Sequence, residues 1–157
     1  MSSELERLED QLKRSFEGGA WHGPSVLETL EDVTPDAAVA HPLPGAHSIW
    51  ELVLHLAATY RLVLRRLEGN ETPLTPAEDW PPVPVAAESN WQDAIRSLKQ
   101  LNQQLRSAVL AFNAGQLDQP LASSYTAYTQ FIGLTQHDLY HAGQIALLRK
   151  ALREAMG

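Results

Sequence analysis

Apolar residues recur at three- and four-residue intervals in four long stretches of the sequence. This spacing places them on one face of an α-helix, so it predicts four amphipathic helices. The first helix begins after Ser2 or Ser3, either of which can cap it, and ends at Gly18. The second helix opens at Ser48, which stands three residues before Glu51 as a capping box requires.

Glycines and serines set the remaining helix boundaries. The second helix ends at Gly69, and the third begins near Ser89 and ends at Gly115. The fourth begins within residues 124–128 and continues to about residue 155. A single amphipathic helix is marginal in water, so the four apolar stripes must pack on one another. The pattern therefore predicts an all-α, antiparallel four-helix bundle.

Two connectors are longer than a tight hairpin needs. Residues 20–47 are mixed in character, and Pro24 and Pro35 can each open a short helix there. Residues 70–88 hold five of the ten prolines, a density that forbids regular helix. A proline-rich connector of this length suggests a crossover along the bundle, packed on its surface.

Length, charge and cysteine content narrow the class of protein. A chain of 157 residues is the size of one domain, so we expect residues 1–157 to form a single one. A net charge of −7 argues against nucleic-acid binding and against anionic lipid surfaces. There are no cysteines, so any metal must be held by His, Asp or Glu. The sequence has no signal peptide and no long apolar run, so we expect a soluble protein of the cytoplasm.

Two histidines interrupt the apolar stripe of the fourth helix. His137 and His141 stand four residues apart, on the same face and one turn from each other. One helix offers two imidazoles to one metal ion at this spacing. Gln144 lies close to the same face, and Gly143 allows a close approach to the backbone. The alternative is a pair of core histidines, each hydrogen-bonded to a protein partner.

The second helix supplies a third histidine. His55 falls near the edge of the apolar stripe, where the alternative is a boundary histidine with one solvated nitrogen. If the second and fourth helices face each other, His55 can converge with the histidine pair. Three neutral imidazoles suit zinc, nickel, iron or copper and leave coordination positions open. The remaining histidines are predicted to face solvent: His22, His41 and His47. Of these, His47 can line a mouth of the site.

The aromatic residues are predicted mainly to pack. Trp50 and Trp91 stand in first turns of helices, where core packing is the usual role, and Trp21 and Trp80 are expected to pin loops onto the bundle. One or two tryptophans could instead wall a ligand pocket. The candidates for substrate binding are Trp50, Tyr140 and Gln144.

Two segments resemble the motifs of a known family. Residues 49–56, Ile-Trp-Glu-Leu-Val-Leu-His-Leu, resemble the second-helix motif of the DinB/YfiT-like superfamily. Residues 137–145 resemble its fourth-helix motif, His-x-x-x-His followed by Gly-Gln-Ile. The resemblance implies an up-down-down-up bundle, often a homodimer, with a divalent metal, usually nickel or zinc. The implied ligands are His55, His137 and His141.

The resemblance also implies two kinds of chemistry on a small-molecule substrate. Members of the superfamily are described as metal-dependent hydrolases, and others as transferases or isomerases that use bacillithiol, mycothiol or glutathione. A bound dication lowers the pKa of a coordinating thiol or of water. Water activation calls for a nearby general base, and Asp138 is rotated by about 100° from the histidine face. This favours a thiol transferase over a hydrolase. A non-catalytic, stress-related dimeric module held together by metal is the third alternative.

Overall fold

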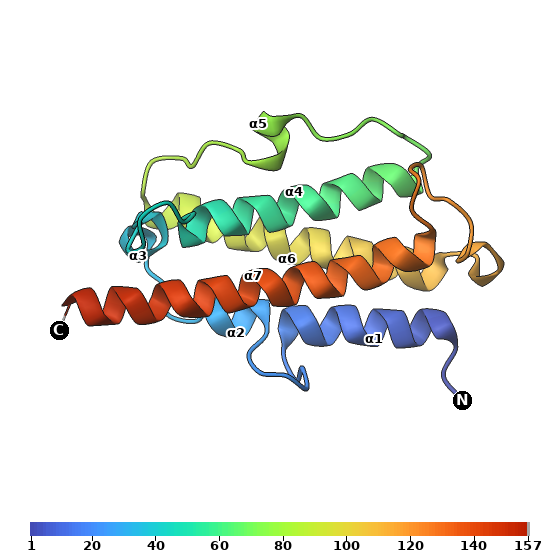
Figure 1. Cartoon of the computed structure of the whole chain (residues 1–157), viewed down its shortest axis with the longest axis horizontal. Coiled ribbons are helices and arrows are strands. Elements are labelled where there is room, and N and C mark those ends of the chain that lie inside the picture. Colours follow the sequence, from blue (N-terminus) through green and yellow to red (C-terminus); the bar gives the residue numbers. More distant parts are fainter. Residues whose placement is uncertain (157) are drawn as a thin grey trace.

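Four long helices run along the length of the molecule. The computed structural model describes residues 1–156, and this range contains helices but no β-strand. Figure 1 shows two of the long helices running in one direction and two in the other, so the expected up-down-down-up bundle is confirmed. The four are α1 (Glu4–Glu17), α4 (Ile49–Leu67), α6 (Glu88–Ala111) and α7 (Ala127–Met156).

Side-chain caps fix where α1, α4 and α7 begin, whereas α6 begins after Ala87 without a side-chain cap. Ser48 forms the predicted capping box with Glu51, and Ser3, one of the two predicted caps of the first helix, forms a capping box with Glu6. α7 opens where the Thr129 N–H donates to Thr126 Oγ1 over 3.1 Å, inside the predicted window. α6 ends before the predicted Gly115, because the chain there forms the 3₁₀ helix η1 (Ala114–Gln116).

The connectors contain three short helices. α2 (Val26–Leu30) is opened by Ser25 in a capping box with Glu28, so the prediction that Pro24 opens it was wrong by two residues. α3 (Pro35–Val39) begins at Pro35 as predicted. In the connector α4–α6, Figure 1 shows α5 (Pro76–Asp79) lying over α4. The prediction that the prolines exclude all helix there was therefore wrong, because a proline fits the first turn of a helix.

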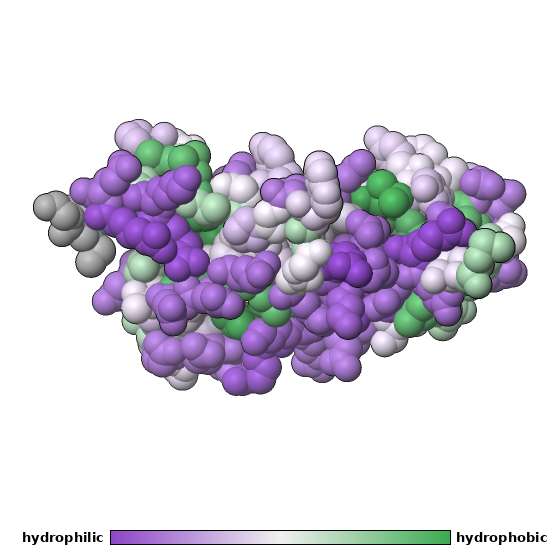
Figure 2. All heavy atoms as spheres, turned by 90° about the horizontal axis from the view of Figure 1, so that it is seen from below, coloured by the Kyte–Doolittle hydropathy of each residue, from purple (hydrophilic) through white to green (hydrophobic). Residues whose placement is uncertain are grey.

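Each long helix packs against two others. α4 contacts α6 and α7, and α1 contacts the same two helices from the opposite side. Their apolar stripes form one core, whose largest fully buried side chains include Trp50, Trp91, Tyr60, Phe16 and Phe131. The surface on the side of α1 and α2 is mostly hydrophilic, with small apolar patches scattered over it (Figure 2). No helix in residues 1–156 combines the length and apolar character needed to cross a membrane. The neighbouring positions of α4 and α7 create the site described next.

Candidate metal centre

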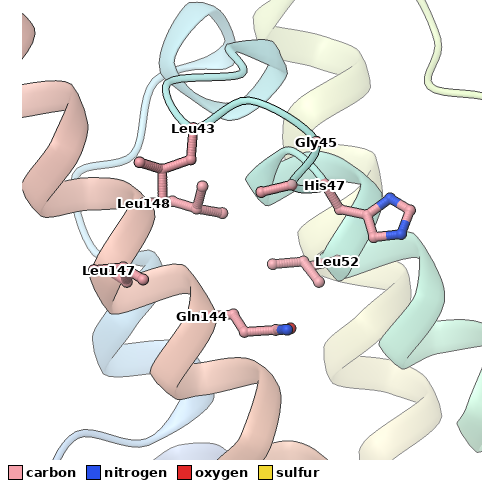
Figure 3. A pocket seen from close by; sticks show the side chains of 8 residues that line it. Leu43, Gly45, His47, Leu52, Gln144, Leu147 and Leu148 are labelled. Atoms are coloured by element: carbon pink, nitrogen blue, oxygen red, sulfur yellow. The ribbon is translucent and has the colours of Figure 1, made fainter.

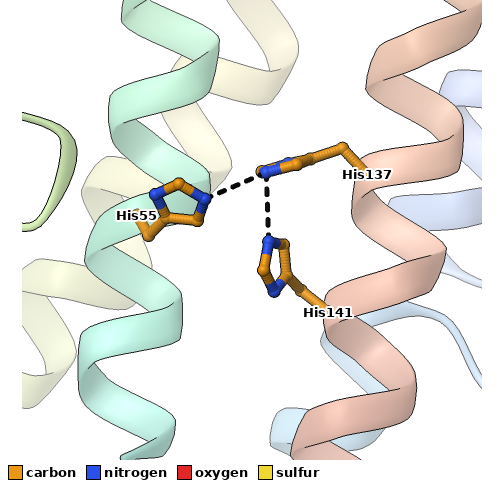
Figure 4. A group of neighbouring side chains, drawn as sticks. All are labelled: His55, His137 and His141. Atoms are coloured by element: carbon orange, nitrogen blue, oxygen red, sulfur yellow. Dashed lines mark hydrogen bonds between the residues drawn. The ribbon is translucent and has the colours of Figure 1, made fainter. Parts of the chain in front are cut away.

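Three histidines from two helices converge between α4 and α7. His55 projects from α4, and His137 and His141 project from successive turns of α7 (Figure 4). The Nε2 atom of His137 lies 3.1 Å from Nε2 of His55 and 3.0 Å from Nε2 of His141. The potential ligand atoms of all three lie within 4.8 Å of one another. The structure thus brings together the three residues that the sequence analysis grouped.

The outer nitrogens of two of these rings contact oxygen acceptors. His55 Nδ1 is 3.0 Å from the main-chain oxygen of Asp79 and 3.0 Å from its carboxylate Oδ1. His141 Nδ1 is 2.6 Å from Gln144 Oε1. These oxygens accept hydrogen bonds, so both Nδ1 atoms carry the ring proton. The Nε2 atom of each ring is then left with its lone pair pointing into the cluster, as in histidines that ligate metals.

His137 is the third histidine of the group, and its ring is neutral and has no acceptor on its outer nitrogen. Its Nδ1 is buried and has no hydrogen-bond partner. Burial, followed by the neighbouring His141 and His55, lowers the pKa of His137 to about 3. Burial is also the main cause that lowers the pKa of His141. Both rings therefore stay neutral at physiological pH, which is the form that binds metal.

The geometry fits a small divalent cation. If His137 also carries its proton on Nδ1, three lone pairs face one space, and only a cation there satisfies all three. If His137 carries it on Nε2, that N–H can serve only one of its two neighbours. Nitrogens bound at 2.0–2.1 Å to one tetrahedral ion lie about 3.3 Å apart, close to the two short spacings. The three residues thus fit a divalent metal ion.

An aromatic stack covers one side of the cluster. The ring of Trp80 lies parallel to the ring of His55 at a centroid distance of 4.1 Å. The opposite face of Trp80 stacks on His47, at 3.6 Å and 11°. Trp80 therefore stands between the two histidines and shields His55 from solvent. The prediction that Trp80 pins its loop is confirmed, whereas the same prediction for Trp21 was wrong, because its side chain is fully exposed.

The connector is held in this place by local hydrogen bonds. Thr75 caps α5, and the side chain of Glu78 accepts a 2.8 Å hydrogen bond from the Thr75 N–H. Arg65 of α4 donates to the same carboxylate over 2.9 Å. These bonds, with that from Thr75 first, lower the pKa of Glu78 to about 2. The next residue along the chain is Asp79, so this anchoring sets its contact with His55.

A second polar cluster is buried behind the site. Asp138 is fully buried and accepts hydrogen bonds from the Tyr60 hydroxyl at 2.6 Å and from Ser15 at 3.0 Å. Burial raises the pKa of this carboxyl to about 7, opposed by the two hydrogen bonds. Asp138 thus contacts α4 and α1 rather than a histidine of the cluster. Its bonds fix the rotation of α7 at the point where His137 projects toward the metal site.

The candidate substrate-binding residues occupy three different settings. Tyr140 is 66% exposed, and its ring meets the ring of His141 edge-on at 5.1 Å, so it borders the cluster. Gln144 contacts His141 directly, as described above. Trp50 is fully buried against Trp91, at a centroid distance of 5.0 Å, and presents no surface to a bound molecule.

The other three histidines are exposed, as predicted. His41 Nε2 lies 3.0 Å from Glu51 Oε2, and His47 Nδ1 lies 3.7 Å from the same oxygen. His47 also stacks on Trp80, so the expectation that it lines the mouth of the site agrees with its position. Neither His22 nor His41 belongs to the metal-ligand group found within residues 1–156.

Sequence reasoning missed Asp79, although the signal was present. The segment Thr75-Pro76-Ala77-Glu78 has the spacing of a capping box with a proline in its first turn. That pattern predicts a helical turn and places Asp79 and Trp80 at its end. What it cannot give is the position of this turn over α4, which depends on the packing of the whole connector.

Fold and site together define a class: a four-helix bundle with a three-histidine group compatible with a divalent metal. Comparison with protein families identifies the family within this class. The DinB superfamily matches residues 20–145, and the chain belongs to that superfamily. Searches of curated proteins and of solved structures gave no match.

Proposed function

We propose that this protein is a metal-dependent enzyme that transfers a low-molecular-weight thiol to an electrophilic small molecule. His55, His137 and His141 are the residues that hold the metal, with zinc or nickel as the expected ion. A divalent ion held by three imidazoles keeps positions open and lowers the pKa of a thiol that coordinates it.

The choice between thiol transfer and hydrolysis rests on which side chains form the cluster. Within the described residues, the group of metal-ligating side chains contains three histidines and no carboxylate. The nearest acidic partner, Asp79, contacts the outer nitrogen of His55, on the side away from the convergence point. Hydrolysis would need a general base beside the attacking water. Thiol activation needs no such base, because the metal itself favours the thiolate.

The surrounding residues orient the histidine rings and limit access to the metal site. Asp79 and Gln144 hold the rings of His55 and His141 with their Nε2 atoms directed inward. Trp80 covers the outer face of His55, and Tyr140 stands at the edge of His141. The chain has no cysteine, so the sulfur nucleophile arrives with the cosubstrate.

The reaction balances without a redox partner. The thiol sulfur forms a bond to the electrophilic carbon, and the bond from that carbon to its leaving group breaks. The thiol proton and the leaving group are released together as an acid. The family resemblance further supports a homodimer, which size-exclusion chromatography with light scattering tests directly.

The test uses protein purified without a polyhistidine tag and loaded with zinc or nickel. Bacillithiol, mycothiol, glutathione and coenzyme A are each mixed with monobromobimane, and the S-bimane product is quantified by chromatography. We expect metal-dependent acceleration with at least one thiol, lost in His137→Ala while the helical circular dichroism signal is kept. Acceleration with none of the thiols contradicts the transferase. Metal-dependent hydrolysis of an activated ester in its place supports the hydrolase, and loss of the fold in His137→Ala supports a structural metal.

A further inference from the structure

An apolar pocket lies next to the candidate metal centre and is used by none of the chemistry above. It has a volume of about 250 Å³ and is lined chiefly by four leucines, with two polar side chains, as Figure 3 shows: Leu43, Leu52, Leu147, Leu148, His47 and Gln144. An apolar cavity of about 150 Å³ is enough to bind benzene. This pocket is therefore large enough for a single ring or an alkyl chain of about six carbons.

The pocket shares residues with the metal centre. Gln144 lines the pocket and also contacts Nδ1 of His141 at 2.6 Å. His47 lines it and stacks on Trp80, whose other face covers His55. The two polar side chains of the pocket are thus the ones that link it to the histidine cluster.

Helix geometry places the pocket and the histidine cluster along the same faces of α4 and α7. Leu148 follows His141 by seven residues and Leu52 precedes His55 by three, spacings that keep side chains on one helix face. The seven residues correspond to about 10 Å along α7. A molecule of modest length can therefore reach from the pocket to the cluster.

Part of the pocket wall is open to solvent. Leu147 is 55% exposed, although leucine is a residue that folding usually buries. Leu148 and Leu52 deeper in the pocket are almost fully buried. An exposed leucine over a buried apolar floor is what a ligand with an apolar group would cover on binding.

We propose that this pocket binds an apolar group of the substrate, an unbranched alkyl chain or a single ring, and so presents the reactive end of that molecule to the metal centre. This inference rests on the proposed function, because it assigns the substrate class of the same site. The enzyme then acts on amphipathic electrophiles with a short apolar tail.

The first measurement is calorimetric titration of the zinc-loaded protein with acetohydroxamate and with hexanohydroxamate. Both probes carry the same metal-binding head and differ by four methylene groups, each worth about fourfold in affinity when fully buried. We expect hexanohydroxamate to bind at least about tenfold more tightly. Equal affinities for the two probes overturn the pocket while leaving the metal centre intact.

Matched variants test whether the higher affinity for hexanohydroxamate arises in the pocket. Leu147→Asp places a charge at the pocket, and Ala46→Phe fills space in its lining. Both are expected to reduce the preference for hexanohydroxamate to less than about threefold. The control is Leu110→Asp, at a leucine of α6 that is 47% exposed and lies outside the pocket. A preference that falls equally in Leu147→Asp and Leu110→Asp overturns the proposal.

A probe without a metal-binding head separates this inference from the proposed function. 1-Hexanol is titrated into metal-free protein and followed by the backbone amide signals of Leu147 and Leu148. Shifts that saturate in the wild type and vanish in Leu147→Asp support the pocket even if the protein binds no zinc, the result that would defeat the proposed function. Absence of these shifts overturns the pocket.

Discussion

The hydroxyl of Tyr60 donates a 2.6 Å hydrogen bond to Asp138, across the interface of α4 and α7. Asp138 directly follows His137 in the chain and lies on a different face of α7. The next turn of the helix carries His141. The bond is fully buried, so it fixes how α7 is rotated against α4. The positions of the metal-site histidines depend on that rotation.

Tyr60→Phe is therefore expected to destabilise the fold. The substitution keeps the ring and leaves a buried carboxyl with one hydrogen bond fewer, which costs about 1–3 kcal/mol. Urea unfolding followed by circular dichroism measures the change. The control is Tyr128→Phe on α7, where the exposed side chain predicts a change within about 0.5 kcal/mol. Equal stability of the two variants would contradict the proposed role of Tyr60.

Removal of metal is expected to lower the stability of the protein without unfolding it. An ion that binds only the native state stabilises it by about 2.7 kcal/mol at a free concentration of 100 times its Kd. Thermal unfolding with added zinc, and again after chelation, measures this difference. His137→Ala should show no effect of zinc, because its ligand is gone. A zinc-dependent rise in Tm of equal size in that variant would place the ion elsewhere.

Asp79→Ala is expected to weaken metal binding. Loss of a partner of a metal-ligating histidine reduces affinity by about 10–100-fold. We expect the lower end of this range, because the main-chain oxygen of residue 79 still accepts from His55. Competition with a chromophoric chelator measures the Kd. Asp118→Ala, at an exposed aspartate in the turn before α7, is the control. Unchanged affinity in Asp79→Ala would show that this contact does not support His55.

Glu78 provides a pH-dependent test of how the connector is anchored. Its pKa is lowered from 4.5 to about 2 in the folded protein, first by the hydrogen bond from Thr75. A lowered pKa means that the carboxylate contributes its full stabilisation above pH 4.5 and loses it as the pH falls toward 2. Carbon-detected NMR titration of the carboxyl group measures the midpoint, which Arg65→Met should raise, because it removes the guanidinium that donates to this carboxylate over 2.9 Å. A wild-type midpoint near 4.5 would contradict the anchoring.

The sequence predicted the four long helices because their signals are local. The capping box of Ser48 and Glu51 and the apolar stripe behind it lie within one segment, so α4 begins where predicted. The spacing of His137 and His141 is likewise a property of one helix. The convergence with His55 followed once the bundle placed α4 beside α7.

The remaining features depend on long-range packing. Asp79 reaches His55 only because the connector folds back over α4, and Trp80 finds its place between two histidines that are eight residues apart. The partners of Asp138 are 78 and 123 positions away in the chain. Periodicity within one segment contains no information about such pairs.

The most direct test of the three-histidine centre is its metal content. Protein purified without a polyhistidine tag is analysed by elemental mass spectrometry beside the His55→Ala variant. We expect close to one nickel or zinc ion per chain in the wild type and its loss in the variant, with the helical signal kept. A wild-type protein that is empty and takes up no added metal, or a variant that keeps its full metal content, would contradict this expectation.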